Sequence, residues 1–158
     1  MSATDILAVV AAAMTPIGEL RVAIPLGIEM RGMAWYEAYG WAVLGNLVPV
    51  VVLLWALDPL SKLLLAFPNP AGRLLEWRVD RLRKTRAKTF QRWGALALVP
   101  FVAIPLPVTG AWTGCLAAWA FGIRRRTAFP AIVLGVLVAG VIVTLLTELV
   151  REFPFIGS

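Results

Sequence analysis

Apolar residues are gathered in four long zones along the chain, and most charged residues lie in the segments between these zones. The zones cover residues 6–28, 38–57, 93–123 and 127–147. A helix needs about 20 apolar residues to cross the hydrocarbon core of a bilayer. The pattern therefore predicts an all-α integral membrane protein with a single membrane domain, residues 1–158.

The second and fourth zones have the length of ordinary transmembrane helices and contain no charged residue. They predict membrane spans over about residues 35–57 and about residues 127–149.

The third zone is more than 30 residues long, which would give a helix of about 45 Å at 1.5 Å per residue. That is too long for one span and too short for two. The sequence Ile104-Pro105-Leu106-Pro107-Val108-Thr109-Gly110 lies in its middle and favours a break between two half-helices. We expect a re-entrant hairpin over about residues 93–123. The first zone has a similar break at Thr15-Pro16-Ile17-Gly18, which predicts another re-entrant hairpin over about residues 4–30.

Basic residues distinguish this plan from four straight spans. Residues 58–92 form a linker that reads as a basic amphipathic helix, and Arg124-Arg125-Arg126 follow the third zone. Four straight spans would place the linker and the arginine triplet on opposite sides of the membrane, against the positive-inside rule. Two re-entrant hairpins place both on the cytoplasmic side of a multi-pass inner (plasma) membrane protein, with both termini outside.

The two halves of the chain then have the same plan in opposite orientations. Residues 1–57 and residues 93–150 each hold one hairpin and one span, and the segment Val43–Val48 is similar to Val133–Val138. Inverted repeats whose broken helices meet near the membrane midplane are typical of transporters. Because two full spans enclose a pathway poorly, we expect a homodimer or a larger homo-oligomer.

Composition removes several classes of function. The chain is 60% hydrophobic and only 15% charged, with a net charge of +6, no histidine and a single cysteine, Cys115. The lack of histidine excludes histidine-based catalysis and histidine-ligated metal sites, and no metal or other cofactor is expected. No pairing of a nucleophile with a base is visible, so an enzyme is not expected. Nucleic-acid binding is not expected either, because the basic residues lie between membrane segments. Membrane lipids are the expected surroundings.

Glu19 and Arg21 lie inside the first zone, where each charge costs roughly 2.5 to 3.5 kcal/mol on insertion scales. Residues two apart on a helix point to nearly opposite faces, so each charge needs another partner. One interpretation is a substrate site in which Arg21 binds an anionic group and Glu19 exchanges a proton or holds a cation. The other is structural: a helix dipole favours Glu19, and Arg21 satisfies carbonyl groups of the other hairpin.

The second break supplies further candidates. Freed backbone groups persist in lipid only where protein buries them or where they line a wet space, and exposed N–H groups at the start of a half-helix attract anions. The alternative is a tightly packed turn with threonine caps. Thr15 and Pro16 fit an N-cap and a first helical position. Beside Glu19 and Arg21, the substrate-binding candidates are Thr15, Pro16, Pro105, Pro107, Thr109, Gly110, Trp112 and Thr113.

Two segments resemble the signature segments of the putative small multidrug export protein family. They are Pro16-Ile-Gly-Glu19-Leu-Arg21-Val-Ala-Ile-Pro25-Leu-Gly27 and Pro100-Phe-Val-Ala-Ile-Pro105-Leu-Pro107-Val-Thr109-Gly110-Ala111-Trp112-Thr113-Gly114. That family is distantly similar to the DedA (VTT, SNARE-associated) membrane proteins. The resemblance implies paired re-entrant hairpins and an inverted repeat, and movement of lipid phosphates across bacterial membranes. The DedA proteins carry a dense set of acidic and arginine residues, and in this chain that set is reduced to Glu19 and Arg21.

Three hypotheses follow. The first is a small transporter of an anionic amphiphile or lipid phosphate, coupled to protons or ions, with a midplane site formed by the two hairpins. The second is proton-coupled efflux of organic cations or drugs that uses Glu19. The third is a non-transporting membrane scaffold.

Overall fold

A computed structural model describes residues 2–66, 70–105 and 109–152. Every element in these ranges is helical, and strands are absent from them. Pro107 lies outside the described residues. The elements are α1 (Ala3–Met14), α2 (Glu19–Pro25), the π-helix η1 (Leu26–Met30), α3 (Trp35–Ala66), α4 (Pro70–Trp93), the 3-10 helix η2 (Gly94–Ala97), α5 (Leu98–Ala103), α6 (Ala111–Ala120) and α7 (Arg125–Glu152).

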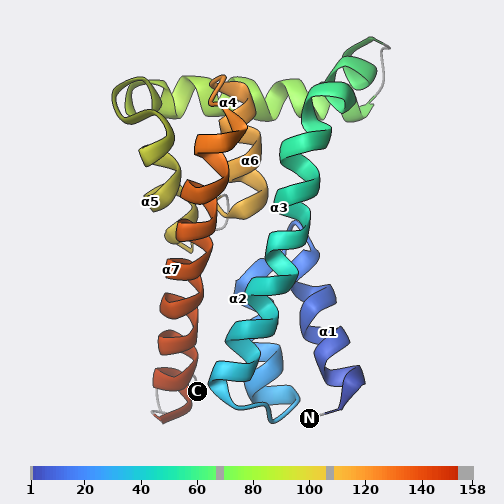
Figure 1. Cartoon of the computed structure of the whole chain (residues 1–158), viewed down its shortest axis with the longest axis vertical. Helices are drawn as coiled ribbons and strands as arrows, with labels where there is room; N and C mark the ends of the chain where they lie inside the picture. Colours follow the sequence, from blue (N-terminus) through green and yellow to red (C-terminus); the bar gives the residue numbers. More distant parts are fainter. Residues whose placement is uncertain (1, 67–69, 106–108, 153–158) are drawn as a thin grey trace.

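Two long helices, α3 and α7, run along most of the molecule (Figure 1). The segments Trp35–Leu63 and Arg125–Glu152 are long and apolar enough to cross a membrane. Helix α3 continues beyond the expected span of residues 35–57, through Asp58 to Ala66, and is 32 residues long. Many of its large apolar side chains, and many on α7, are exposed, among them Leu44, Val52, Trp55, Leu134 and Leu145. Exposed apolar faces of this extent fit contact with lipid better than contact with water.

Two pairs of shorter helices occupy opposite ends of this frame. Helices α1 and α2 run up and back at the end that carries both chain termini, and α5 and α6 do the same at the other end (Figure 1). Each pair packs internally and against α3 and α7. The turns of the two pairs approach each other near mid-height of the molecule (Figure 1).

Helix α4 lies across the end of the molecule that holds α5 and α6 (Figure 1). Most of it is exposed, and its buried residues lie on one side: Gly72, Val79, Leu82 and Phe90. The Phe90 ring stacks on Phe121 at a centroid distance of 4.5 Å. The Arg83 guanidinium donates hydrogen bonds to the Ala120 carbonyl at the end of α6. Helix α4 is therefore amphipathic and is attached by its apolar side.

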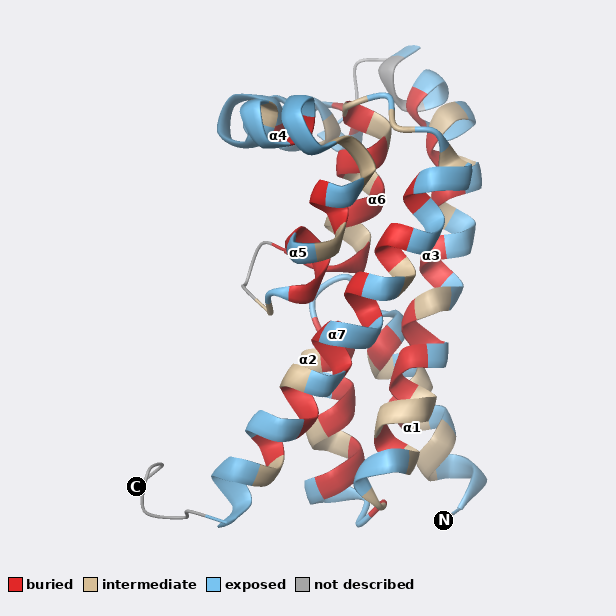
Figure 2. Ribbon diagram, turned by 60° about the vertical axis from the view of Figure 1, so that its left-hand side comes forward, coloured by how far each residue is buried: buried red, intermediate tan, exposed pale blue. Residues whose placement is uncertain are grey.

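Glycines allow the first helix of each pair to approach a long helix closely. An added Cβ at Gly45 of α3 would lie 2.8 Å from the Val10 carbonyl oxygen of α1. An added Cβ at Gly135 of α7 would lie 2.9 Å from the Val99 carbonyl oxygen of α5. Both distances are below those that real side chains tolerate. Figure 2 shows that buried residues follow the inward faces of the helices where these contacts occur.

The first break differs from its expected geometry. Thr15 caps the C-terminal end of α1, and α2 begins only at Glu19, with Gly18 as its N-cap. The expectation that Pro16 is the first residue of the second half-helix was therefore wrong, while Thr15 does make the side-chain hydrogen bond that an N-cap would make. The reason is local: the backbone of Glu19 has φ 45°, which interrupts regular helix after the turn. Thr15 still accepts a hydrogen bond from the Gly18 N–H at 3.1 Å and donates one to the Ala12 carbonyl at 2.7 Å.

Candidate functional site

The two breaks are joined through Glu19, the first residue of α2. One carboxylate oxygen accepts a hydrogen bond from the Ala111 N–H at 3.1 Å, and the other accepts one from the Trp112 N–H at 3.2 Å. Both donors belong to the first turn of α6, where helical N–H groups have no partner within their own helix. The Glu19 residue is only 8% exposed. A buried carboxylate of one hairpin thus occupies the helix N-terminus of the other.

Gly110 makes this approach possible. Its φ of 148° lies in a region that favours glycine. A Cβ atom added there would lie 2.7 Å from the Glu19 carboxyl carbon. The absence of a side chain therefore leaves the space in which the carboxylate lies.

Arg21 reaches the same junction but binds the carbonyl side of the break. Its guanidinium donates a hydrogen bond to the Thr109 carbonyl oxygen. The Thr109 hydroxyl donates in turn to the Ile104 carbonyl at 2.6 Å. These bonds satisfy carbonyl groups that the interrupted helix leaves open, as the structural interpretation of Arg21 expected. Within the described residues Glu19 and Arg21 form no ion pair with each other, and each is bound by the other hairpin.

Asn46 of α3 also belongs to this site, although it was not among the site residues predicted from the sequence. It is 1% exposed, and its side-chain oxygen has no hydrogen-bond partner within the described residues. It lines a small cavity together with Glu19, Arg21, Pro105 and Gly110. Nothing in the sequence indicated that this asparagine lines the same cavity as Glu19.

The cavity at this junction is very small. Its volume is about 10 Å³, which is near the lower limit for one water molecule. An amphiphile or drug does not fit in this arrangement of the helices. Any larger ligand would require the two hairpins to separate, which would break the Glu19 and Arg21 contacts.

The structure brings some of the predicted site residues together and leaves others apart. Glu19, Arg21, Pro105 and Gly110 line the cavity, while Thr109 and Trp112 contribute backbone groups to its hydrogen bonds. Thr113 is partly buried on α6 and makes no side-chain hydrogen bond within the described part of the chain. Thr15 and Pro16 are exposed on the turn of the first hairpin and do not line the cavity. Pro107 cannot be compared, because it lies outside the described residues.

The electrostatics of the junction favour a negative charge at the N-terminal end of α6. The N-terminal end of α6 carries a partial positive charge from its dipole and from free N–H groups. Glu19 supplies the matching negative charge from within the protein. The same donors could bind an external anion only if the Glu19 carboxylate moved away or became protonated.

Comparison with known proteins identifies one family. The family model described as "Putative small multi-drug export protein" matches residues 19–142, which begin directly after the first break and include α2, α3, α4, the second break and most of α7. No curated protein and no solved structure matches the chain. The family description agrees with a membrane protein that exports a substrate rather than with an enzyme. The chain belongs to the putative small multi-drug export protein family.

Proposed function

We propose that the protein is a small membrane transporter for an anionic amphiphile or lipid phosphate, and that Glu19 acts as its gate. The observation that carries the proposal is the Glu19 carboxylate on the Ala111 and Trp112 N–H groups. An internal carboxylate at a helix N-terminus is a substitute for the anion that such an end would otherwise bind.

The proposed topology has the two helix pairs entering the bilayer from opposite leaflets as re-entrant hairpins. Helix α4 and Arg124–Arg126 would lie at the cytoplasmic surface of the inner membrane, and both termini outside. The grouping of basic residues around α4 and the start of α7 supports this orientation.

The proposed inverted repeat is supported by matching contacts in the two halves. Helix α1 packs on α3 as α5 packs on α7, and α2 packs on α7 as α6 packs on α3. Gly45 and Gly135 receive the first helix of their own hairpins in the same way. In transporters of this plan, one repeat moves against the other about a central site.

The proposed cycle begins with the closed junction. A proton on Glu19 removes the negative charge that the α6 N–H groups hold, and this weakens the contact between the hairpins. The anionic group of the substrate then takes the place of the carboxylate on the same N–H groups, and Arg21 leaves the Thr109 carbonyl to pair with it. Loss of the proton would return Glu19 to α6 and release the substrate. A homodimer would supply the remaining walls of the pathway.

Flux through reconstituted vesicles tests this role. We expect Arg21→Ala to reduce translocation of a fluorescent short-chain phosphatidate at least tenfold, because the anion loses its only described charged partner at the junction. Glu19→Gln should reduce the dependence of this flux on a pH gradient. Arg31→Ala is the matched control: this arginine pairs with Asp5 at the exposed outer end of the molecule, and its loss should leave flux unchanged. Parental flux in folded Arg21→Ala protein would contradict the proposal.

Efflux of organic cations is the second candidate, because Glu19 forms no ion pair within the described residues and a cationic drug could supply one. Cation efflux predicts the opposite dependence of transport on Glu19 and Arg21. Glu19→Gln would abolish binding of a cationic dye such as ethidium, while Arg21→Ala would keep it. A non-transporting scaffold predicts that both variants change only stability, with no phosphatidate or ethidium flux in the parent.

A further inference from the structure

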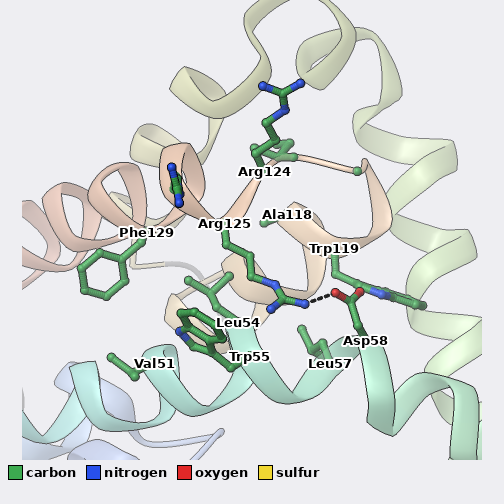
Figure 3. A pocket seen from close by; sticks show the side chains of 13 residues that line it. Val51, Leu54, Trp55, Leu57, Asp58, Ala118, Trp119, Arg124, Arg125 and Phe129 are labelled. Atoms are coloured by element: carbon green, nitrogen blue, oxygen red, sulfur yellow. Dashed lines mark hydrogen bonds and ion pairs between the residues drawn. The ribbon is translucent and has the colours of Figure 1, made fainter.

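A second and much larger hollow lies at the α4 end of the molecule, away from the Glu19 junction. It has a volume of about 850 Å³ and lies between α3, the end of α6 and the start of α7 (Figure 3). Its wall is mainly apolar and includes Val51, Leu54, Trp55, Trp119 and Phe129. We call it the inner groove.

Charged residues line one margin of the inner groove. Three arginines, Arg124, Arg125 and Arg126, and a single carboxylate, that of Asp58, line this margin. Arg125 points across the groove, where it pairs with Asp58 and lies 5.3 Å from the centre of the Trp55 ring (Figure 3). Arg124 and Arg126 are exposed, and the side chain of neither forms a hydrogen bond or ion pair within the described residues. The margin therefore carries an excess of two positive charges.

We propose that the inner groove binds an anionic phospholipid from the leaflet that faces α4. The headgroup phosphate would lie against the arginines, and an acyl chain would follow the apolar wall. Basic pockets between membrane helices on the cytoplasmic side bind anionic headgroups in this way. Guanidinium groups suit the task because they bind phosphate oxygens through two parallel hydrogen bonds.

The position of the groove supports a lipid as the occupant. Helix α4 lies across the same end of the molecule with an exposed basic side (Figure 1), as expected of a helix at a membrane surface. The arginine margin then lies at headgroup depth and the apolar wall extends toward the acyl chains. This proposal uses no part of the Glu19 junction and does not depend on transport.

Asp58 acts as an internal competitor for the headgroup. Its pair with Arg125 is partly exposed, with 49% of the Asp58 side chain and 39% of the Arg125 side chain accessible. Ion pairs of this exposure contribute little to stability, so a phosphate can displace the carboxylate without unfolding the helices.

Native mass spectrometry of the detergent-solubilised full chain tests the charge requirement. Phosphatidylglycerol and phosphatidylcholine with the same acyl chains are the two probes, and glycerol phosphate is the headgroup alone. Replacing Arg124, Arg125 and Arg126 together with Gln should weaken phosphatidylglycerol binding roughly a hundredfold, since each of the three arginines near a headgroup contributes about 1 kcal/mol. The matched control changes Arg73, Lys84 and Lys88 of α4, all exposed, to Gln and should leave binding unchanged.

Asp58→Asn gives a result of the opposite sign. It frees Arg125 and should tighten phosphatidylglycerol binding several-fold, whereas a role of the arginines in folding alone would give no increase. Unchanged or weaker binding in this variant would count against the site, as would equal binding of phosphatidylcholine or saturable binding of glycerol phosphate without a chain.

A steric pair tests the apolar wall. Val51→Trp projects into the inner groove, while Val52→Trp changes the next residue of α3, which is 57% exposed and lies outside the groove. Only the first should lower lipid binding. If Val51→Trp instead separates a dimer and leaves the bound lipid per chain unchanged, a second copy of the chain occupies the groove and the proposal is overturned.

Discussion

At the scale of single residues, the carboxylate of Glu19 is bound by backbone groups of a helix that begins 92 residues later in the chain. A charge inside the membrane costs roughly 2.5 to 3.5 kcal/mol on insertion scales. Two hydrogen bonds from the first turn of α6 offset this cost, since charge-assisted bonds contribute about 1.5 to 3 kcal/mol each. Glu19 is thus stabilised only while the two hairpins are together, which is the property that a gate requires.

Gly110→Ala tests this dependence directly. The added methyl group would lie 2.7 Å from the Glu19 carboxyl carbon and would impose a side chain at φ 148°. We expect a loss of about 2 to 4 kcal/mol, from backbone strain together with lost hydrogen bonds, measured as a lower Tm in detergent.

Gly94→Ala is the control for backbone strain alone, because Gly94 has φ 52° and open space around it. The stability lost in Gly94→Ala should be about 1 kcal/mol. If the two variants lose equal stability, the close approach of Glu19 to Gly110 has no energetic importance.

At the scale of elements, close packing of the hairpins on the long helices organises both halves. Gly45 faces α1 and Gly135 faces α5, each without room for a Cβ atom. Small residues let helix backbones approach within membranes, where packing contacts replace the hydrophobic effect as the main source of association.

Matched substitutions test whether the halves are built alike. Gly45→Ala and Gly135→Ala should each lower stability by about 1 to 3 kcal/mol, as overpacking does, and by similar amounts. Gly40→Ala, on α3 with no atom within 4 Å of the added Cβ, should not lower stability. A large effect in one half only, with a neutral substitution in the other, would contradict the proposed repeat.

The helical elements were largely predictable because lipid imposes strong constraints on length and polarity. Proline and glycine indicated the break at 15–18, and uncharged length indicated the break within 93–123. The contact of Glu19 with α6 was not predictable, since it joins residues that are remote in sequence and depends on how the hairpins pack. The π-helix η1 and the extension of α3 to Ala66 were also missed, because hydrophobic pattern does not determine where a helix near the membrane surface ends or changes its winding.

At the scale of the whole molecule, the chain combines two long helices, two broken helical hairpins at opposite ends and one amphipathic helix across one end (Figure 1). The proposed orientation places α4 and the start of α7 at one membrane surface and both termini at the other. The Glu19 junction would then lie between the leaflets, and the inner groove at the cytoplasmic surface. Transport would require the hairpins to separate around the junction, while α3 and α7 maintain the frame.

Accessibility of single cysteines to a membrane-impermeant maleimide tests this arrangement most directly. The background is Cys115→Ser, which removes a fully buried thiol, and cysteines replace the exposed residues Ser2, Lys84, Thr127 and Arg151 in separate variants. The account predicts that Lys84→Cys and Thr127→Cys react only from the cytoplasmic side, and that Ser2→Cys and Arg151→Cys react only from the outside. Reaction of Thr127→Cys from the side opposite to Lys84→Cys would mean that the third zone crosses the membrane completely, and would contradict the account.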